Sequence, residues 1–236
     1  RVFTIAGRYM YEDRWGGELD WTPEFRGGDS IYGESIYTSR WEAFGVYELP
    51  MTEKVNFSFS ANGHDQNSVY GDTWYVANQS VLFGQLTWFK KIKKHDFTTG
   101  LAYRYTYYDD NSIATVDPNQ IHLPGVFIQD QISLSKLSTL LLGGRYDYNS
   151  NHGNVFSPRA NYKWRSKNKK NTLRLSAGNG FRVVNLFTEE HAAFTGTRDL
   201  VVKEELRPET SWNGNVNYVK KFLFKNDAFL SLDFSG

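Results

Sequence analysis

Charged residues at alternate positions of otherwise apolar stretches are the side chains of this sequence best placed to bind a ligand. They are Arg104, Arg145, Asp147, Arg159, Lys163 and Arg174. If alternate residues of a strand point to one side, these charges gather on one surface. That surface could line the path of a charged ligand, or it could hydrate a wet interior and pair across strands. For any single residue, we favour the second interpretation.

Two longer polar segments, 13–34 and 182–209, combine aromatic rings with cationic side chains. The candidate ligand contacts are Trp15, Trp21, Phe25 and Arg26 in the first segment, and Phe187, His191, Phe194 and Arg198 in the second. Rings beside cations suit the binding of an anionic or aromatic metal chelate. The alternative, which we favour for each segment, is that the rings pack these segments onto each other.

A metal or catalytic centre is not indicated. His191 could be considered as a haem or metal ligand, but a metal site needs several convergent ligands. The sequence contains no Gly-x-Ser-x-Gly, no phosphate-binding P-loop and no His-Glu-x-x-His motif. We therefore predict no metal site, no cofactor and no enzymatic activity.

Composition narrows the class of protein. The chain has 236 residues, 40% hydrophobic and 22% charged, with a net charge of +1 and no cysteine. The charge gives no reason to expect a nucleic-acid partner, and disulfides and thiol chemistry are excluded. No apolar run approaches the roughly 20 residues of a membrane helix. Aromatic residues reach 17% and glycines number 20, a combination typical of membrane β-barrels.

Two-residue alternation is the dominant pattern. In residues 55–62, Val55, Phe57, Phe59 and Ala61 fall on one face, and Asn56, Ser58, Ser60 and Asn62 fall on the other. We predict strands at 2–12, 35–49, 54–65, 76–90, 96–109, 124–134, 139–149, 158–165, 171–181, 210–223 and 228–235. Asp130 breaks the pattern, since it shares a face with Ile128 and Ile132. Either a bulge resets the register, or Asp130 lies at the wet end of its strand.

Connections of alternating length suggest a membrane barrel. Short turns are expected near 50–53, 91–95, 135–138, 166–170 and 225–227, and longer loops at 13–34, 66–75, 110–123, 150–157 and 182–209. Outer-membrane barrels have short periplasmic turns and longer extracellular loops, and aromatic residues collect near their strand ends. Lysine clusters at 90–94 and 167–170 are interpreted as solvated turn charge, with anionic lipid headgroups as the alternative.

Several ordered segments carry a family resemblance. They are Phe127-Ile128-Gln129-Asp130, Gly143-Gly144-Arg145-Tyr146-Asp147, Phe156-Ser157-Pro158-Arg159, the Gly180-Phe181-Arg182 box, and the Pro208-Glu209 element within Leu206-Arg207-Pro208-Glu209-Thr210-Ser211. In order and spacing, these segments resemble the barrel of TonB-dependent outer-membrane receptors. Residues 1–120 resemble the family only through their pattern of strands and loops.

The resemblance implies an architecture larger than this chain. Family members have a 22-stranded barrel closed by a plug domain, with a short box that binds TonB. We expect residues 1–236 to form part of one such all-β, antiparallel transmembrane barrel, a fragment of about eleven strands, with the plug domain and the TonB box outside it. The implied function is TonB-dependent uptake of a scarce solute, such as a ferric siderophore or other metal complex, across the bacterial outer membrane. The implied partners are TonB, the plug, outer-membrane lipid and the solute, and charges such as Arg104 could pair with the plug.

Two alternatives remain open from the sequence. The first is a passive outer-membrane porin, which would have no plug. The second is a soluble β-sandwich or binding module, because alternating strands also suit a half-buried antiparallel sheet.

Overall fold

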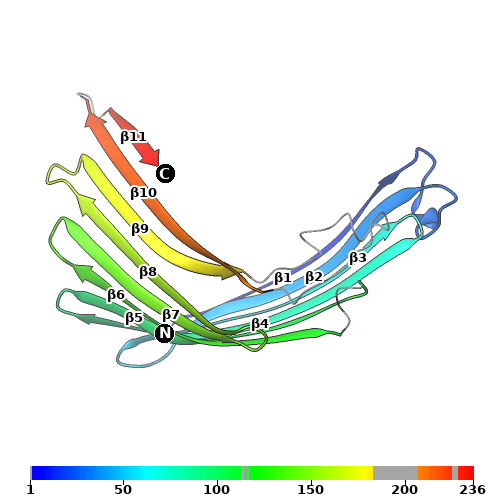
Figure 1. Cartoon of the computed structure of the whole chain (residues 1–236), viewed down its shortest axis with the longest axis horizontal. Helices are drawn as coiled ribbons and strands as arrows, with labels where there is room; N and C mark the ends of the chain where they lie inside the picture. Colours follow the sequence, from blue (N-terminus) through cyan, green and yellow to red (C-terminus); the bar gives the residue numbers. More distant parts are fainter. Residues whose placement is uncertain (1, 113–114, 116, 183–206, 225–227) are drawn as a thin grey trace.

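The chain forms one continuous antiparallel sheet of 11 strands, joined in chain order (Figure 1). The computed structural model describes residues 2–112, 115, 117–182, 207–224 and 228–236. The strands are β1 (Phe3–Gly17), β2 (Gly33–Glu48), β3 (Lys54–Tyr70), β4 (Thr73–Ile92), β5 (His95–Asp110), β6 (Asn119–Ser133), β7 (Ser138–Asn149), β8 (Gly153–Arg165), β9 (Asn171–Arg182), β10 (Glu209–Leu223) and β11 (Phe229–Ser235). One short 3-10 helix, η1 (Pro23–Phe25), lies between β1 and β2. All the predicted strands are present.

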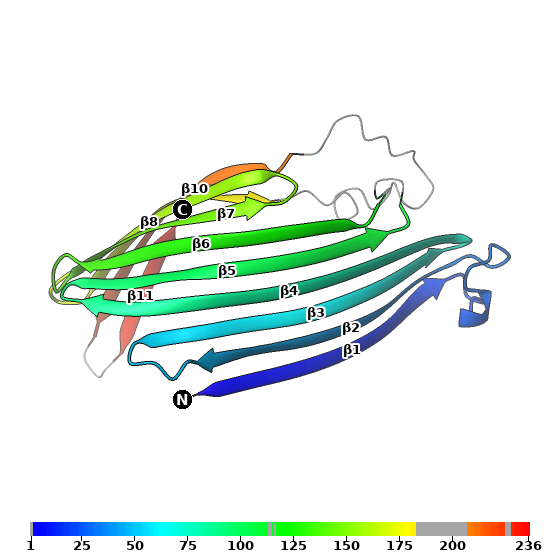
Figure 2. The same ribbon diagram turned by 90° about the horizontal axis from the view of Figure 1, so that it is seen from below.

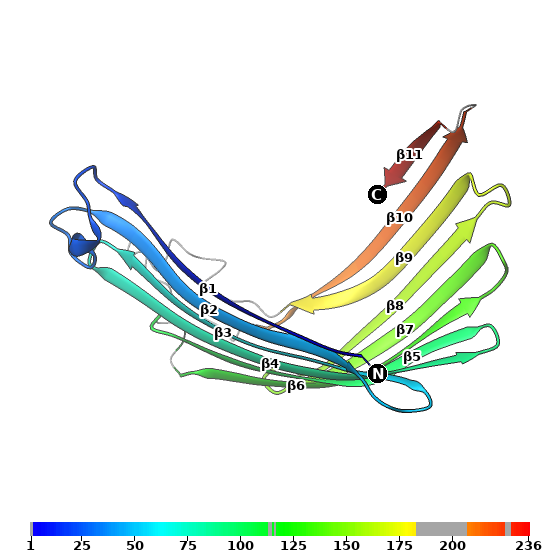
Figure 3. The ribbon, with the colours of Figure 1, turned by 180° about the vertical axis from the view of Figure 1, so that it is seen from behind.

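The sheet bends into an open trough, with β1 along one side and β10 and β11 along the other (Figures 1 and 3). Viewed from below, β1 to β6 run side by side as long, gently curved ribbons (Figure 2). Among the described residues, no second sheet packs against this one. The alternative of a soluble β-sandwich, which needs two packed sheets, is therefore not supported.

The strands keep one register from β3 to β7. On one face Ser58, Gln85, Ala102, Gly125 and Asp147 follow one another as directly paired residues. The opposite face is carried by the neighbouring residues, with Phe57 beside Leu86, Leu101 and Val126. Because paired residues point to the same side of a sheet, the sequence alternation becomes two continuous surfaces, here called the polar face and the apolar face.

The polar face is the concave one. A hollow of about 290 Å³ is lined entirely by polar-face residues from β3 to β7, namely Ser60, Asn62, Val81, Phe83, Arg104, Leu123 and Arg145. A hollow that spans five neighbouring strands forms where a sheet curves inward. The apolar face is therefore convex, and it leaves large side chains such as Leu101 (59%), Ile128 (59%) and Phe156 (62%) exposed. A surface this apolar is suited to lipid rather than water.

Aromatic residues form two bands on the convex face. Near the short turns the band comprises Phe3, Tyr47, Trp88, Phe97, Tyr162, Trp164 and Tyr218. Toward the other end, the loop end, it comprises Tyr9, Trp41, Tyr103, Tyr105, Tyr146 and Trp212. Small and aliphatic residues such as Ala43 and Leu101 lie between the two bands. Aromatic girdles of this kind mark the two interfaces of a bilayer.

Two of the predicted long loops are wrong. β3 and β4 contain 17 and 20 residues and continue to a turn at Gly71-Asp72, so residues 66–75 are mostly strand. β8 begins at Gly153, so the predicted loop 150–157 shrinks to residues 150–152. The loops at 13–34 and 110–123 also shorten, to 18–32 and 111–118. These outer strand segments lie beyond the bilayer, where water reaches both faces and no apolar alternation is required.

The structure resolves the position of Asp130. This residue pairs with Phe97 and with Leu142 in an unbroken register, so no bulge is present. Asp130 therefore lies on the apolar face, close to the short turns. There its carboxylate oxygen lies 2.5 Å from Nδ1 of His95 on the neighbouring strand. A polar partner at the water-exposed end of the strand makes the carboxylate tolerable on this face.

Candidate functional site

The candidate site is the polar concave face from β5 to β9. Register places all of the charged residues singled out from sequence on it: Arg104, Arg145, Asp147, Arg159, Lys163 and Arg174. Four strands contribute, β5, β7, β8 and β9. That these residues line a ligand path remains a prediction, but the structure places them together on one surface, as such a path requires.

Asp147 is the most deeply buried charge of this face, with 2% of its surface exposed. Arg145 on the same strand donates two hydrogen bonds of 2.7 Å, from Nε to Oδ2 and from Nη2 to Oδ1. Directly opposite on β6 is Gly125, where an added Cβ would lie 2.0 Å from Asp147 Oδ1. The bidentate pair therefore requires glycine at position 125. A buried carboxylate held this way is a fixed structural element and is not free to bind a ligand.

Arg159 lies between two glycines in the register, Gly143 on β7 and Gly178 on β9. An added Cβ at Gly143 would lie 3.5 Å from the Arg159 side chain, and one at Gly178 would lie 3.3 Å from its Cβ. This space lets the guanidinium reach across β7 and donate a hydrogen bond to Gln129 Oε1. On β9, Arg174 donates to Asn217 Oδ1 at 2.7 Å. Both arginines thus hydrogen-bond to neutral side chains, which do not compensate their positive charge.

Positive charge on this face is only partly compensated. Within the described part of the chain, Arg104, Arg159, Lys163 and Arg174 form no ion pair. Arg104 and Arg145 line the hollow of about 290 Å³ together. Of the described acids on this face, Asp147 is neutralised by Arg145 and Asp96 is bound to Lys91. Asp110 lies at the loop end of β5, where it binds Tyr108. The surface is therefore suited to attract an anion.

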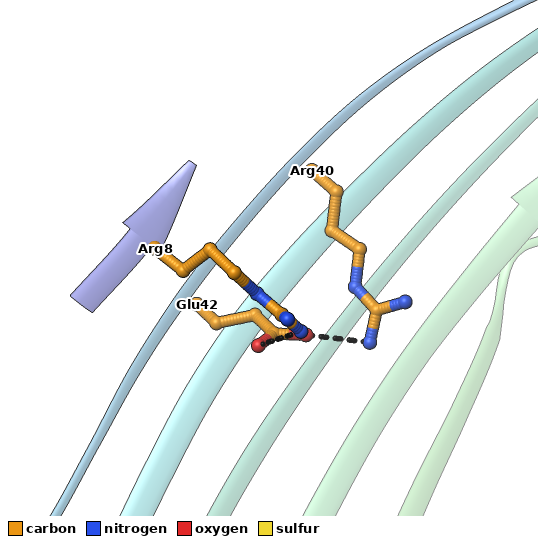
Figure 4. A network of polar contacts seen from close by, with 3 residues as sticks. All are labelled: Arg8, Arg40 and Glu42. Atoms are coloured by element: carbon orange, nitrogen blue, oxygen red, sulfur yellow. Dashed lines mark hydrogen bonds and ion pairs between the residues drawn. The ribbon is translucent and has the colours of Figure 1, made fainter. Parts of the chain in front are cut away.

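A second charged group lies on the same face at the edge of the sheet (Figure 4). Glu42 of β2 binds Arg8 of β1 at 2.7 Å and Arg40 of its own strand at 2.6 Å. The sequence prediction missed all three residues. Strict alternation around residue 42 was the available signal, but Phe44 and Val46 share its face and obscure the polar pattern.

A third group, also missed from sequence, lies on the polar face at the loop end. The Tyr108 hydroxyl donates to Asp110 Oδ2 at 2.7 Å, and the Tyr75 hydroxyl lies 3.0 Å from that of Tyr108. Burial, together with these bonds, raises the pKa of Tyr75. Burial opposes ionisation of Asp110, but hydrogen bonds from Ser112 and Tyr108 outweigh it and lower the pKa of this carboxyl. The group ties β4 to β5 beyond the bilayer.

The loop candidates of segment 13–34 lie on the opposite side of the sheet. Trp21 is buried (4% exposed) over Gly33, with its ring 5.2 Å from that of Trp15. Arg26 binds Asp13 at 2.7 Å, and its guanidinium lies 4.9 Å from the centre of the Tyr37 ring. Asp13, Trp15 and Tyr37 all belong to the apolar face.

These contacts fold segment 18–32 onto the outside of the protruding strands. Phe25 ends the short helix η1 of this segment and is half-buried. The role of Trp15, Trp21, Phe25 and Arg26 as ligand contacts remains a prediction, and their contacts match the packing alternative. Phe187, His191, Phe194 and Arg198 lie outside the described residues.

The two family motifs of the C-terminal half pair with each other. Gly180, Phe181 and Arg182 at the end of β9 lie opposite Ser211, Thr210 and Glu209 of β10. Arg182 binds Glu209 at 2.9 Å across the strands, and Pro208 immediately precedes β10. Both charged side chains are 59% exposed, so the pair contributes little to stability and chiefly fixes the register.

No three histidine, cysteine, aspartate or glutamate side chains in the described ranges are placed to share a metal ion. No helix of the described segments is long and apolar enough to cross a bilayer.

Comparison with protein-family models decides the class of the protein. Residues 2–235 match the model described as "TonB dependent receptor-like, beta-barrel". The chain belongs to this family. It is thus part of a receptor barrel of the bacterial outer membrane, and the family is one of transport receptors rather than enzymes. The expected fold, an all-β antiparallel section of a larger barrel, is confirmed.

Relatives agree with the family assignment. An iron-regulated outer membrane virulence protein of Vibrio cholerae serotype O1 is 33% identical over 89 residues, 37% of this chain and 14% of the relative. The siderophore receptor PirA of Pseudomonas aeruginosa matches in structure with a TM-score of 0.61 and 16% identity, over 92% of this chain and 45% of PirA. PiuA, a siderophore receptor of Acinetobacter baumannii, matches with a TM-score of 0.61 and 10% identity, over 99% of this chain and 47% of PiuA. The receptor chain thus spans less than half the length of these solved structures, and at such low identity they show the fold alone.

Proposed function

We propose that this chain forms one wall of a receptor that imports a scarce anionic solute, such as a ferric siderophore or other metal complex, by TonB-dependent active transport. The observation that carries the proposal is the uncompensated arc of Arg104, Arg159, Lys163 and Arg174 on the concave face. Support for the solute class comes from the relatives, which are described as siderophore receptors and as an iron-regulated outer membrane protein.

The two faces of the sheet have different roles in this proposal. The apolar face keeps the wall in lipid, and the polar face borders an aqueous interior. In that interior the cations have two uses: to attract an anionic solute and to pair with carboxylates of a plug domain. We assign the plug and the TonB-binding box to segments outside residues 1–236, and these residues to a single barrel domain.

The test removes single charges from the concave face of the full-length receptor. Arg104→Gln and Lys163→Gln should each weaken the binding of an anionic ferric chelate about fivefold, which corresponds to roughly 1 kcal/mol for a partly screened charge. The loss should shrink at high salt, because added ions screen the attraction. The matched control is Lys136→Gln, which removes one exposed charge from the short turn between β6 and β7.

Two outcomes would contradict the proposal. If both variants bind the chelate as tightly as the control, the cationic arc has no part in solute capture. If uptake continues unchanged in cells without TonB, the passive porin alternative replaces active transport.

A further inference from the structure

Two turns of the sheet hold lysines in a conformation that lysine rarely adopts. Among the described residues, the non-glycine residues with positive φ are Lys93 (55°) and Lys169 (58°). Lys93 belongs to the two-residue turn between Ile92 and His95. Lys169 lies in the turn between β8 and β9, where its amide donates to the Ser166 carbonyl oxygen at 2.9 Å. Glycine or asparagine would adopt this backbone conformation more easily.

The lysines of these turns have no acidic partners. Lys93, Lys94, Lys167 and Lys169 are exposed, and none of them forms an ion pair with a described residue. Asp96, the acid closest in sequence to the first turn, is bound to Lys91 at 3.3 Å. Residues 164–171 contain no acidic residue at all. Each turn is therefore a compact, uncompensated positive charge.

The turns lie at the level of lipid headgroups. Trp164 of the convex face is the penultimate residue of β8, just before the second turn, and Phe97 follows the first turn by a similar distance. Aromatic residues of barrels lie at the membrane interface, so the exposed ammonium groups, three to five residues further along the chain, reach the phosphate layer. The short turns of outer-membrane barrels face the periplasm. A strained backbone at an exposed charge suggests that the charge itself is needed there.

We propose that the lysine turns between β4 and β5 and between β8 and β9 bind the phosphate groups of anionic phospholipids in the periplasmic leaflet. Anionic lipid is favoured over zwitterionic lipid because no acidic side chain in the turns is free to receive a headgroup ammonium. The binding would anchor the short-turn end of the barrel at a fixed depth. This proposal requires the barrel to lie in the outer membrane, but it does not depend on which solute is carried.

The experiment uses the full-length receptor in nanodiscs of phosphatidylethanolamine with phosphatidylglycerol, and native mass spectrometry counts the lipids that stay bound. The Lys93→Asn/Lys169→Asn variant should lose enrichment of phosphatidylglycerol by about fivefold for each lysine removed. Its unfolding midpoint should stay the same or rise, because asparagine tolerates positive φ. The Lys93→Arg/Lys169→Arg variant keeps both charges and should keep the enrichment.

A matched control removes the same amount of charge from the other surface. Arg104→Gln/Lys163→Gln neutralises two concave-face residues, and it should leave lipid enrichment unchanged even if solute binding is weakened. Equal enrichment in the asparagine variant and the unaltered receptor would overturn the proposal. So would an enrichment that is insensitive to salt, or selective binding of an acidic periplasmic peptide in place of lipid.

Discussion

Replacing Gly125 with alanine removes the space that the buried Asp147 carboxylate occupies. The new Cβ would lie 2.0 Å from Asp147 Oδ1, 3.0 Å from its Cγ and 3.1 Å from Arg145 Nη2. Ordinary van der Waals contact begins near 3.4 Å, so the carboxylate must move by more than an ångström. A shift of this size breaks at least one of the two 2.7 Å hydrogen bonds from Arg145.

The expected cost of Gly125→Ala in free energy of unfolding is about 2–4 kcal/mol. Overpacking costs roughly 1–3 kcal/mol, and loss of a charged hydrogen bond costs about 1.5–3 kcal/mol. The cost of the lost hydrogen bond lies near the lower end of its range, because the Arg145 side chain is 35% exposed and can bind water instead. Alanine also makes the unfolded chain less flexible, which returns about 0.4–1 kcal/mol.

The assay is equilibrium guanidinium unfolding of the full-length receptor folded into phospholipid vesicles. Gly214→Ala is the matched control, because Gly214 is also a strand residue and an added Cβ meets nothing within 4 Å. We expect this control to be neutral or slightly stabilising. In an Asp147→Ala background, Gly125→Ala should cost much less than alone, since the clash is gone. Equal stability of the Gly125→Ala and Gly214→Ala receptors would refute the reasoning.

Three further predictions concern other parts of the sheet. Arg182→Ala and Glu209→Ala should each cost less than about 1 kcal/mol by the same unfolding assay, because both partners are exposed, and a loss well above 2 kcal/mol would contradict this. Trp21→Ala should release segment 18–32, with faster amide hydrogen exchange there and little change in the transmembrane strands, at a local cost of about 3–5 kcal/mol; unchanged exchange would show that Trp21 does not hold the segment. Since the folded pKa of Asp110 lies below its ordinary value of 3.8, its stabilising bonds are complete above that pH and are lost as pH falls through the folded pKa. The protection factor of the Ser112 amide, which donates to Asp110 Oδ1, should therefore fall on acidification below this range in the unaltered receptor, whereas in Asp110→Ala it should be low at every pH.

The strands were predictable because lipid and water impose opposite demands on alternate residues. Residues 55–62 show the rule, and the structure carries the two faces through the register without a break. The alternation is not required where a strand extends beyond the bilayer, because no face of the strand then contacts lipid. Beyond the bilayer both faces meet water, so the ends of β3 and β4 looked like a loop from sequence.

The contents of the site were only partly predictable. The alternation of residues along a strand was enough to place Arg145 and Asp147 on the polar face. Their bidentate hydrogen bond and its dependence on Gly125 are visible only in the three-dimensional structure. Glu42 was hidden by the apolar residues that share its face. The packing of Trp21 over Gly33 depends on a loop folding back across strands, which alternation does not encode.

Side-chain environment along β3 tests the central claim most directly. Residues 1–236 contain no cysteine, so single cysteines at positions 57, 58, 59 and 60 can each carry a spin label in the reconstituted receptor once any cysteine outside this chain is replaced. Labels that replace Phe57 and Phe59 should collide readily with oxygen dissolved in the bilayer, and labels that replace Ser58 and Ser60 should not. The opposite pattern, or no alternation between neighbouring positions, would contradict a wall with its apolar face in lipid.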